Sequence, residues 1–126
     1  MAGNFRHCLV MRTPSQKNPP YGSHQWIDLV DLKMCRRIAQ KVRRDPALMR
    51  IPRENLRRWR RKLGYFAPAH REWELILEQN PMERVLKILT QNNDEGQRLR
   101  QSDPFVGILT ETERRAFLKP DEKTAA

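Results

Sequence analysis

The sequence lacks a long hydrophobic run and a glycine-rich phosphate loop, and each absence excludes a class of protein. No apolar stretch approaches the roughly 20 residues that a transmembrane helix requires. Residues 8–11 form too short an apolar run for the core of a secretory signal. Only five glycines are present, and none belongs to a phosphate-binding loop or to a Gly-x-Ser-x-Gly nucleophile elbow. We therefore expect a cytoplasmic protein. We also expect that it belongs to none of the enzyme classes that these two glycine motifs identify.

Residues that build metal sites and catalytic sites are also scarce. Cys8 and Cys35 lie far apart, with no histidine at metal-ligand spacing, so the pattern favours neither a zinc site nor a disulfide framework. His7, His24 and His70 are isolated from one another and fit no His-Glu-x-x-His motif. The sequence therefore predicts no catalytic residue, no metal and no cofactor, and hence a protein that is not an enzyme.

Positive charge is what the sequence has in excess. The net charge is +10, and residues 33–63 carry thirteen basic and two acidic side chains, a net charge of +11. Residues 1–32 carry three basic and two acidic side chains, and residues 64–126 carry nine and eleven. Such clustering is typical of proteins that bind polyanions. Two alternatives stay open, which are a solvated face and a face neutralised by an acidic partner protein.

Residues 52–64 combine helix signals with a basic face. Pro52 suits the first turn of a helix and Gly64 the position after the last turn. Leu56, Trp59 and Leu63 recur at three- and four-residue steps and so share one side of a helix. The opposite side carries Arg57, Arg58 and Arg61.

A second basic helix is predicted over about residues 29–44, where apolar residues recur with helical spacing. Asp45 and Pro46 then form a short connection, so the layout alone resembles a helix-turn-helix. We expect a two-helix face that binds nucleic acid, with DNA preferred over RNA. The residues predicted to bind it are Lys33, Arg37, Lys41, Arg44, Arg57, Arg58 and Arg61.

The remaining patterns predict short helices and no strand. Pro68 and Pro81 suit helix starts, and Asp94 suits a helix cap. Thr110 and Glu113 have the spacing of a capping box, which predicts a last helix to about residue 118. We therefore predict an all-α protein, a compact bundle of five or six short helices. Its domains would be a flexible N-terminal arm over residues 1–27, one helical domain over 28–118 and a disordered tail over 119–126.

The string Arg-Leu-Arg-Gln-Ser-Asp-Pro-Phe in the acidic half has two interpretations. In the functional one it is a recognition loop, in which Arg98, Arg100 and Phe105 bind a partner. In the structural one Phe105 closes the core, and the two arginines pair with Glu95 or Asp103.

The same string, with the following Gly-Ile-Leu-Thr and Glu-Arg, resembles the C-terminal end of small uncharacterised bacterial helical proteins. The upstream part of those proteins resembles Arg-Arg-Asp-Pro of residues 43–46 and Asn-Leu-x-x-Trp of residues 55–59. The likeness covers residues 28–118, and such proteins are associated with toxin-antitoxin operons beside nucleotidyltransferase-like toxins. It implies a noncatalytic partner or operator-binding role and supplies no site residues. We therefore expect an antitoxin-like, nucleic-acid-binding regulator, the alternative being a protein-interaction module whose basic face binds an acidic partner protein.

Overall fold

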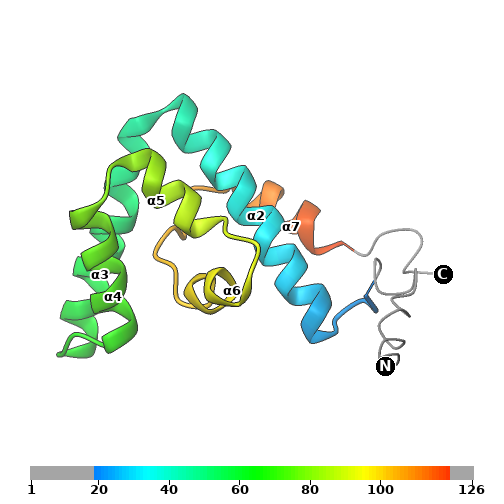
Figure 1. The fold of residues 1–126 in the computed structure, drawn as a ribbon, viewed down its shortest axis with the longest axis horizontal. Helices are drawn as coiled ribbons and strands as arrows, with labels where there is room; N and C mark the ends of the chain where they lie inside the picture. Colours follow the sequence, from blue (N-terminus) through cyan, green and yellow to red (C-terminus); the bar gives the residue numbers. More distant parts are fainter. Residues whose placement is uncertain (1–18, 120–126) are drawn as a thin grey trace, which may run out of the picture.

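The computed structural model describes residues 19–119 and confirms the all-α prediction, because this part of the chain contains helices and no strand. Figure 1 shows α2 as the longest helix, with α3 and α4 side by side near its Arg44 end and α7 beside its middle. The elements are α2 (His24–Arg44), the 3-10 turn η2 (Pro46–Met49), α3 (Arg50–Leu63), α4 (Pro68–Gln79), α5 (Met82–Leu89), α6 (Asp94–Arg100) and α7 (Glu111–Leu118).

Helix α2 begins five residues before the predicted start. The hydroxyl of Ser23 accepts a hydrogen bond from the Trp26 N–H at 3.1 Å and caps the helix. Residues 24–27, which we expected in the arm, are therefore helical, and that boundary was wrong. Residues 1–18 of the predicted arm lie outside the described residues, as does the tail from residue 120.

Helix α3 ends as the sequence predicts. Gly64 adopts a φ of 79°, and its N–H donates to the Arg60 carbonyl at 3.0 Å. Pro52 lies in the first turn, where its missing N–H breaks no helical hydrogen bond. Leu56 is buried, but Leu63 is 47% exposed although it lies on the predicted apolar side, since the helix continues past the core.

The caps of the last two helices show one correction and one confirmation. Asn93, not Asp94, caps α6, because its side-chain oxygen accepts from the Gly96 N–H at 2.8 Å. Thr110 and Glu113 form the predicted capping box of α7, with reciprocal hydrogen bonds of 2.8 and 3.1 Å.

The core is built where α4, α5 and the loop after α6 meet α2. Trp73 and Phe105 are fully buried and pack edge to face, with ring centroids 5.8 Å apart. The indole N–H of Trp73 donates to the Leu99 carbonyl at 3.0 Å. These contacts fix the loop over residues 101–110 against the bundle. None of the helices found between residues 19 and 119 is both long and apolar enough to cross a bilayer.

Candidate nucleic-acid interface

The predicted cations of α3 point into solvent. Arg57, Arg58 and Arg61 are exposed, and no carboxylate of residues 19–119 lies within 4.0 Å of their guanidinium nitrogens. Arg57 and Arg61 are four residues apart, so they share the outward face of the helix at a spacing of about 6 Å along its axis. The structure therefore brings these three predicted residues together as one exposed cationic surface, which we call the α3 face.

A buried asparagine holds the α3 face in position. Asn55 is only 4% exposed, and its amide nitrogen donates to the carbonyls of Pro104 and Val106 at 2.7 and 2.8 Å. Its amide oxygen accepts from Arg58 at 2.6 Å. Asn55 thus anchors α3 to the 101–110 loop and orients one of the exposed guanidiniums. Sequence reasoning missed Asn55, although a polar residue on the apolar side of a helix is a visible signal.

The predicted cations at the centre of α2 are engaged in ion pairs. Lys41 donates to a Glu113 carboxylate oxygen at 2.7 Å and to the Ile108 carbonyl at 2.8 Å. Arg37 donates to the other oxygen of Glu113 at 3.3 Å. The Lys41 ammonium, followed by the Thr110 N–H, lowers the pKa of Glu113 to about 2. Arg37 and Lys41 therefore hold α7 against α2 and do not form an open surface.

The other two predicted cations of α2, Lys33 and Arg44, lie far apart on the helix. Arg43, next to the predicted Arg44, pairs with Glu83 of α5 at 2.7 Å, which raises the pKa of Arg43 and lowers that of Glu83. Lys33 and Arg44 are exposed, and no carboxylate in the described part of the chain lies within 4.0 Å of them. They are about 16 Å apart along the helix axis. Arg36, which was not among the predicted residues, is also exposed, and no carboxylate of residues 19–119 lies within 4.0 Å of it. The two-helix face is thus reduced on α2 to these three cations.

The predicted partner-binding residues face inward or are already paired. Phe105 has no exposed surface. Arg98 binds the carboxylates of Glu72 and Glu95 at 2.8 and 2.7 Å. Arg100 is buried and donates to the carbonyls of residues 89 and 91 at 3.0 and 2.6 Å. The geometry favours the structural interpretation of this string, because Phe105 is buried and both guanidiniums already have partners within the described residues.

The side of α3 that faces α4 has mixed charge. A groove on this side is lined by Arg53, Arg57 and Arg60 of α3, by Glu74 and Glu78 of α4 and by apolar side chains, among them Phe66. Arg57 therefore lies at the border between this groove and the α3 face. The Arg60 guanidinium lies 4.7 Å from the centre of the Phe66 ring. Arg53 donates to the carbonyls of Met49 and Leu77. The carboxylates across the groove, Glu74 and Glu78, disfavour anions on this side.

Two apolar side chains are exposed at the tip of the α3–α4 hairpin. Leu63 is 47% exposed and Tyr65 61% exposed, on either side of Gly64. The preceding residues Arg61 and Lys62 are exposed cations. An aromatic ring beside cations is the combination that binds unpaired bases. Sequence reasoning had not singled out Tyr65, although its place directly after the capping glycine puts it outside the helical stripe.

Within residues 19–119 no three or more His, Cys, Asp or Glu side chains lie close enough together to share a metal ion. Comparisons with protein-family models, with curated proteins and with solved structures find no match for this chain.

Proposed function

We propose that the protein is a noncatalytic nucleic-acid-binding protein whose contact surface is the α3 face. The observation that carries the proposal is the contrast in pairing between the basic helices. Arg57, Arg58 and Arg61 are exposed, and no carboxylate of the described residues lies within 4.0 Å of their guanidinium nitrogens, whereas Arg37 and Lys41 bind Glu113. We therefore place Arg37 and Lys41 outside the interface.

The chemistry of the α3 face suits phosphate. A guanidinium donates hydrogen bonds in a planar fork that matches two phosphate oxygens, and it stays charged at any physiological pH. Lys62 adds a further cation at the end of the helix, and Lys33 and Arg44 lie outside this cluster. Contacts of this kind give affinity for the backbone and do not read base sequence.

The biological role that we propose is that of an antitoxin-like regulator that binds DNA in preference to RNA. The resemblance of residues 28–118 to toxin-antitoxin-associated helical proteins supports this role. So does the shape of the site, because an exposed face on one side of a small bundle leaves the other sides available to a protein partner.

The test is a fluorescence-anisotropy titration of the full chain with a labelled DNA duplex, a DNA single strand and an RNA single strand. Nonspecific protein–DNA dissociation constants are typically about 10⁻⁴ to 10⁻⁶ M at physiological salt. We expect binding in this range for at least one of the three. Unlabelled polyglutamate at the same concentration of negative charge is expected to displace the probe poorly.

Absence of binding at 1 mM protein contradicts the proposal. Displacement by polyglutamate as effective as that by the unlabelled nucleic acid favours the alternative, in which the basic face binds an acidic protein.

A further inference from the structure

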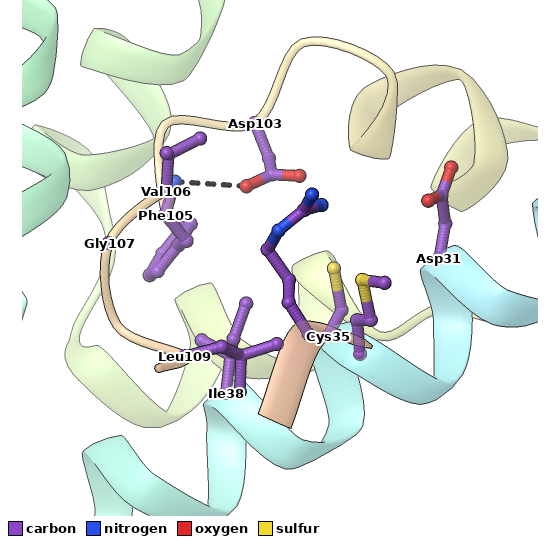
Figure 2. A pocket seen from close by; sticks show the side chains of 10 residues that line it. Asp31, Cys35, Ile38, Asp103, Phe105, Val106, Gly107 and Leu109 are labelled. Atoms are coloured by element: carbon purple, nitrogen blue, oxygen red, sulfur yellow. Dashed lines mark hydrogen bonds between the residues drawn. The ribbon is translucent and has the colours of Figure 1, made fainter. Parts of the chain in front are cut away.

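A cavity of about 220 Å³ opens between α2, the 101–110 loop and α7 (Figure 2). Most of its wall is apolar and comes from Met34, Cys35, Ile38, Phe105, Val106 and Leu109. Figure 2 shows Asp31 on α2 and Asp103 on the loop at different sides of the same space. The cavity is smaller than the roughly 300–1,000 Å³ typical of small-molecule sites, so it suits a single long side chain better than a nucleotide.

The two carboxylates in this cavity lack a paired cation. One oxygen of Asp103 accepts from the Phe105 N–H at 2.9 Å. Within residues 19–119 no Lys or Arg nitrogen lies within 4.0 Å of Asp31 or Asp103. Burial raises the pKa of Asp103 to about 6 and also raises the pKa of Asp31, with repulsion from Asp28 as the second cause for Asp31. A charge removed from water without a partner is a standing energetic cost that a cation would relieve.

The charged groups around the cavity do not remove this cost. Arg100 donates its hydrogen bonds to backbone carbonyls, and its charge lowers the pKa of Asp31 and of Asp103, but less than burial raises them. Arg114 lies 3.5 Å from Glu111 of its own helix. Because its side chain also lines the cavity, it is the cation that a ligand would meet there. Burial raises the pKa of the Cys35 thiol, which is therefore uncharged. With two carboxylates against Arg114, the lining keeps a net negative charge.

We infer that this cavity binds an arginine side chain of a partner protein. The apolar wall suits the aliphatic stem of arginine, and the carboxylates on separate sides suit its fork of donors. The net negative charge of the lining favours a cation as the ligand. The small volume of the cavity favours a single side chain over a larger molecule. This site is distinct from the α3 face and does not depend on nucleic-acid binding.

The test is an NMR titration of the ¹⁵N-labelled full chain with arginine capped as its N-acetyl, N′-methylamide derivative. Capped citrulline, its uncharged isostere, is the matched control. We expect saturable shifts of the Phe105, Val106 and Gly107 amides with capped arginine, and binding at least about tenfold weaker with capped citrulline, a difference of about 1.4 kcal/mol. Equal binding of the two probes, or no shift at 50 mM capped arginine, overturns the inference. Both outcomes are read on the unmodified chain, so they do not depend on a variant that folds.

Variants locate the site. Asp31→Asn with Asp103→Asn is expected to weaken capped arginine at least tenfold, whereas Asp45→Asn, at an exposed carboxylate outside the cavity, changes nothing. Arg114→Gln is expected to tighten binding, because it removes the competing cation. Unchanged affinity in the double variant overturns the inference.

A second arm uses n-butylguanidinium, which has the head and stem of arginine without peptide groups. We expect capped arginine to bind at least as tightly, since its peptide groups reach the rim at Val106 and Gly107. Tighter binding of n-butylguanidinium would assign the cavity to a small free cation and overturn the assignment to a partner protein.

Discussion

Helices α2 and α3 have similar basic patterns in the sequence and different uses in the structure. On α2, Arg37 and Lys41 meet Glu113, and Arg43 meets Glu83. On α3, Arg57 and Arg61 meet no carboxylate within 4.0 Å in the part of the chain that the structure describes. The comparison teaches that the local density of cations does not determine how many are available to a ligand.

The position of each helix in the bundle explains the difference. Helix α2 packs against α5, α6 and α7, so the side chains along its edges come within reach of carboxylates on those helices. Helix α3 packs against α4 and η2, at one end of the molecule in Figure 1, and its outward face meets no other helix. The central position of α2 therefore gives Arg37, Lys41 and Arg43 carboxylate partners on other helices, whereas in the described part of the chain Arg57, Arg58 and Arg61 of the peripheral helix α3 have no carboxylate within 4.0 Å.

Charge reversal on the two helices is the strongest way to break the comparison. We expect Arg57→Glu with Arg61→Glu to lower nucleic-acid affinity at least about 100-fold, because two attractive phosphate contacts become repulsive. Arg37→Gln with Lys41→Gln is expected to change the affinity less than about threefold, while it lowers the midpoint of thermal unfolding. Anisotropy titrations give the affinities and circular dichroism the helix content and the midpoints. Equal losses of affinity in both double variants would mean that α2 and α3 contribute equally to nucleic-acid binding.

The next largest effect concerns Asn55 on the inward side of α3, whose hydrogen bonds hold the helix against the 101–110 loop. We expect Asn55→Ala to lower the free energy of unfolding by about 2–3 kcal/mol, because it leaves two backbone carbonyls of the loop without their donor. Urea denaturation measures the loss. Asn92→Ala, at an exposed position, is the control and is expected to change the free energy by less than about 0.5 kcal/mol. A small effect of Asn55→Ala would show that the loop is held by its other contacts.

Two carboxylates can be compared in the same way as the cations of α2 and α3. Glu113 has a cation as its ion-pair partner, and Asp103 has none within 4.0 Å among the described residues. The folded pKa of Asp103, about 6, exceeds the ordinary value of 3.8, so its cost to stability is absent below about pH 4 and complete above about pH 6. Asp103→Asn is therefore expected to stabilise the protein at pH 8 by on the order of 2 kcal/mol and to have a smaller effect at pH 4. Urea unfolding at the two pH values tests this difference. If Asp103→Asn raised the free energy of unfolding equally at both pH values, titration of Asp103 would be excluded as the cause.

Glu113 should respond in the opposite direction. Its folded pKa, about 2, lies below the ordinary value of 4.5, so the stability that it contributes is present above about pH 4.5 and is lost as the pH falls through 2. Glu113→Gln is expected to destabilise the protein at pH 7 and to have a much smaller effect near pH 2. The same urea measurements at these pH values test it, and equal effects at both would contradict the ion-pair account of α2.

The smallest predicted effect distinguishes single strands from duplexes on the α3 side. Stacking of a base on an aromatic side chain contributes about 1–3 kcal/mol. Tyr65→Ala is therefore expected to weaken single-strand binding about fivefold and to leave duplex binding unchanged. Tyr21 is also exposed, but it packs on Trp26 at the start of α2, and Tyr21→Ala serves as the matched control. Equal losses from the two tyrosine variants would exclude a specific contact of Tyr65.

The parts of the fold that depend on neighbours in sequence were predictable. Gly64 ends α3, and Thr110 with Glu113 caps α7, because both signals act within one helical turn. The start of α2 lies five residues before the predicted one because the Ser23 hydroxyl caps the helix ahead of its regular apolar spacing. Asn93 and Asp94 are both good capping residues, so the choice between them needed the backbone geometry.

The availability of each cation was not predictable, since it depends on pairs far apart in the chain. Lys41 and Glu113 are separated by 72 positions, and nothing in the sequence near either one indicates the other. The outward direction of Arg57 and Arg61 followed from helical spacing alone. The cavity between α2 and the 101–110 loop requires three segments to meet, and no pattern within one segment indicates it.

The central claim is that the exposed guanidiniums of α3 neutralise phosphates, and salt dependence tests it most directly. Each neutralised phosphate of duplex DNA contributes about −0.9 to the slope of log affinity against log salt, so four contacts, from Arg57, Arg58, Arg61 and Lys62, give about −3.6. Arg57→Gln with Arg61→Gln should reduce this slope by about 1.8, and Arg37→Gln with Lys41→Gln should leave it unchanged. A slope near zero for the unmodified protein, or one that falls equally in the two variants, would contradict the claim.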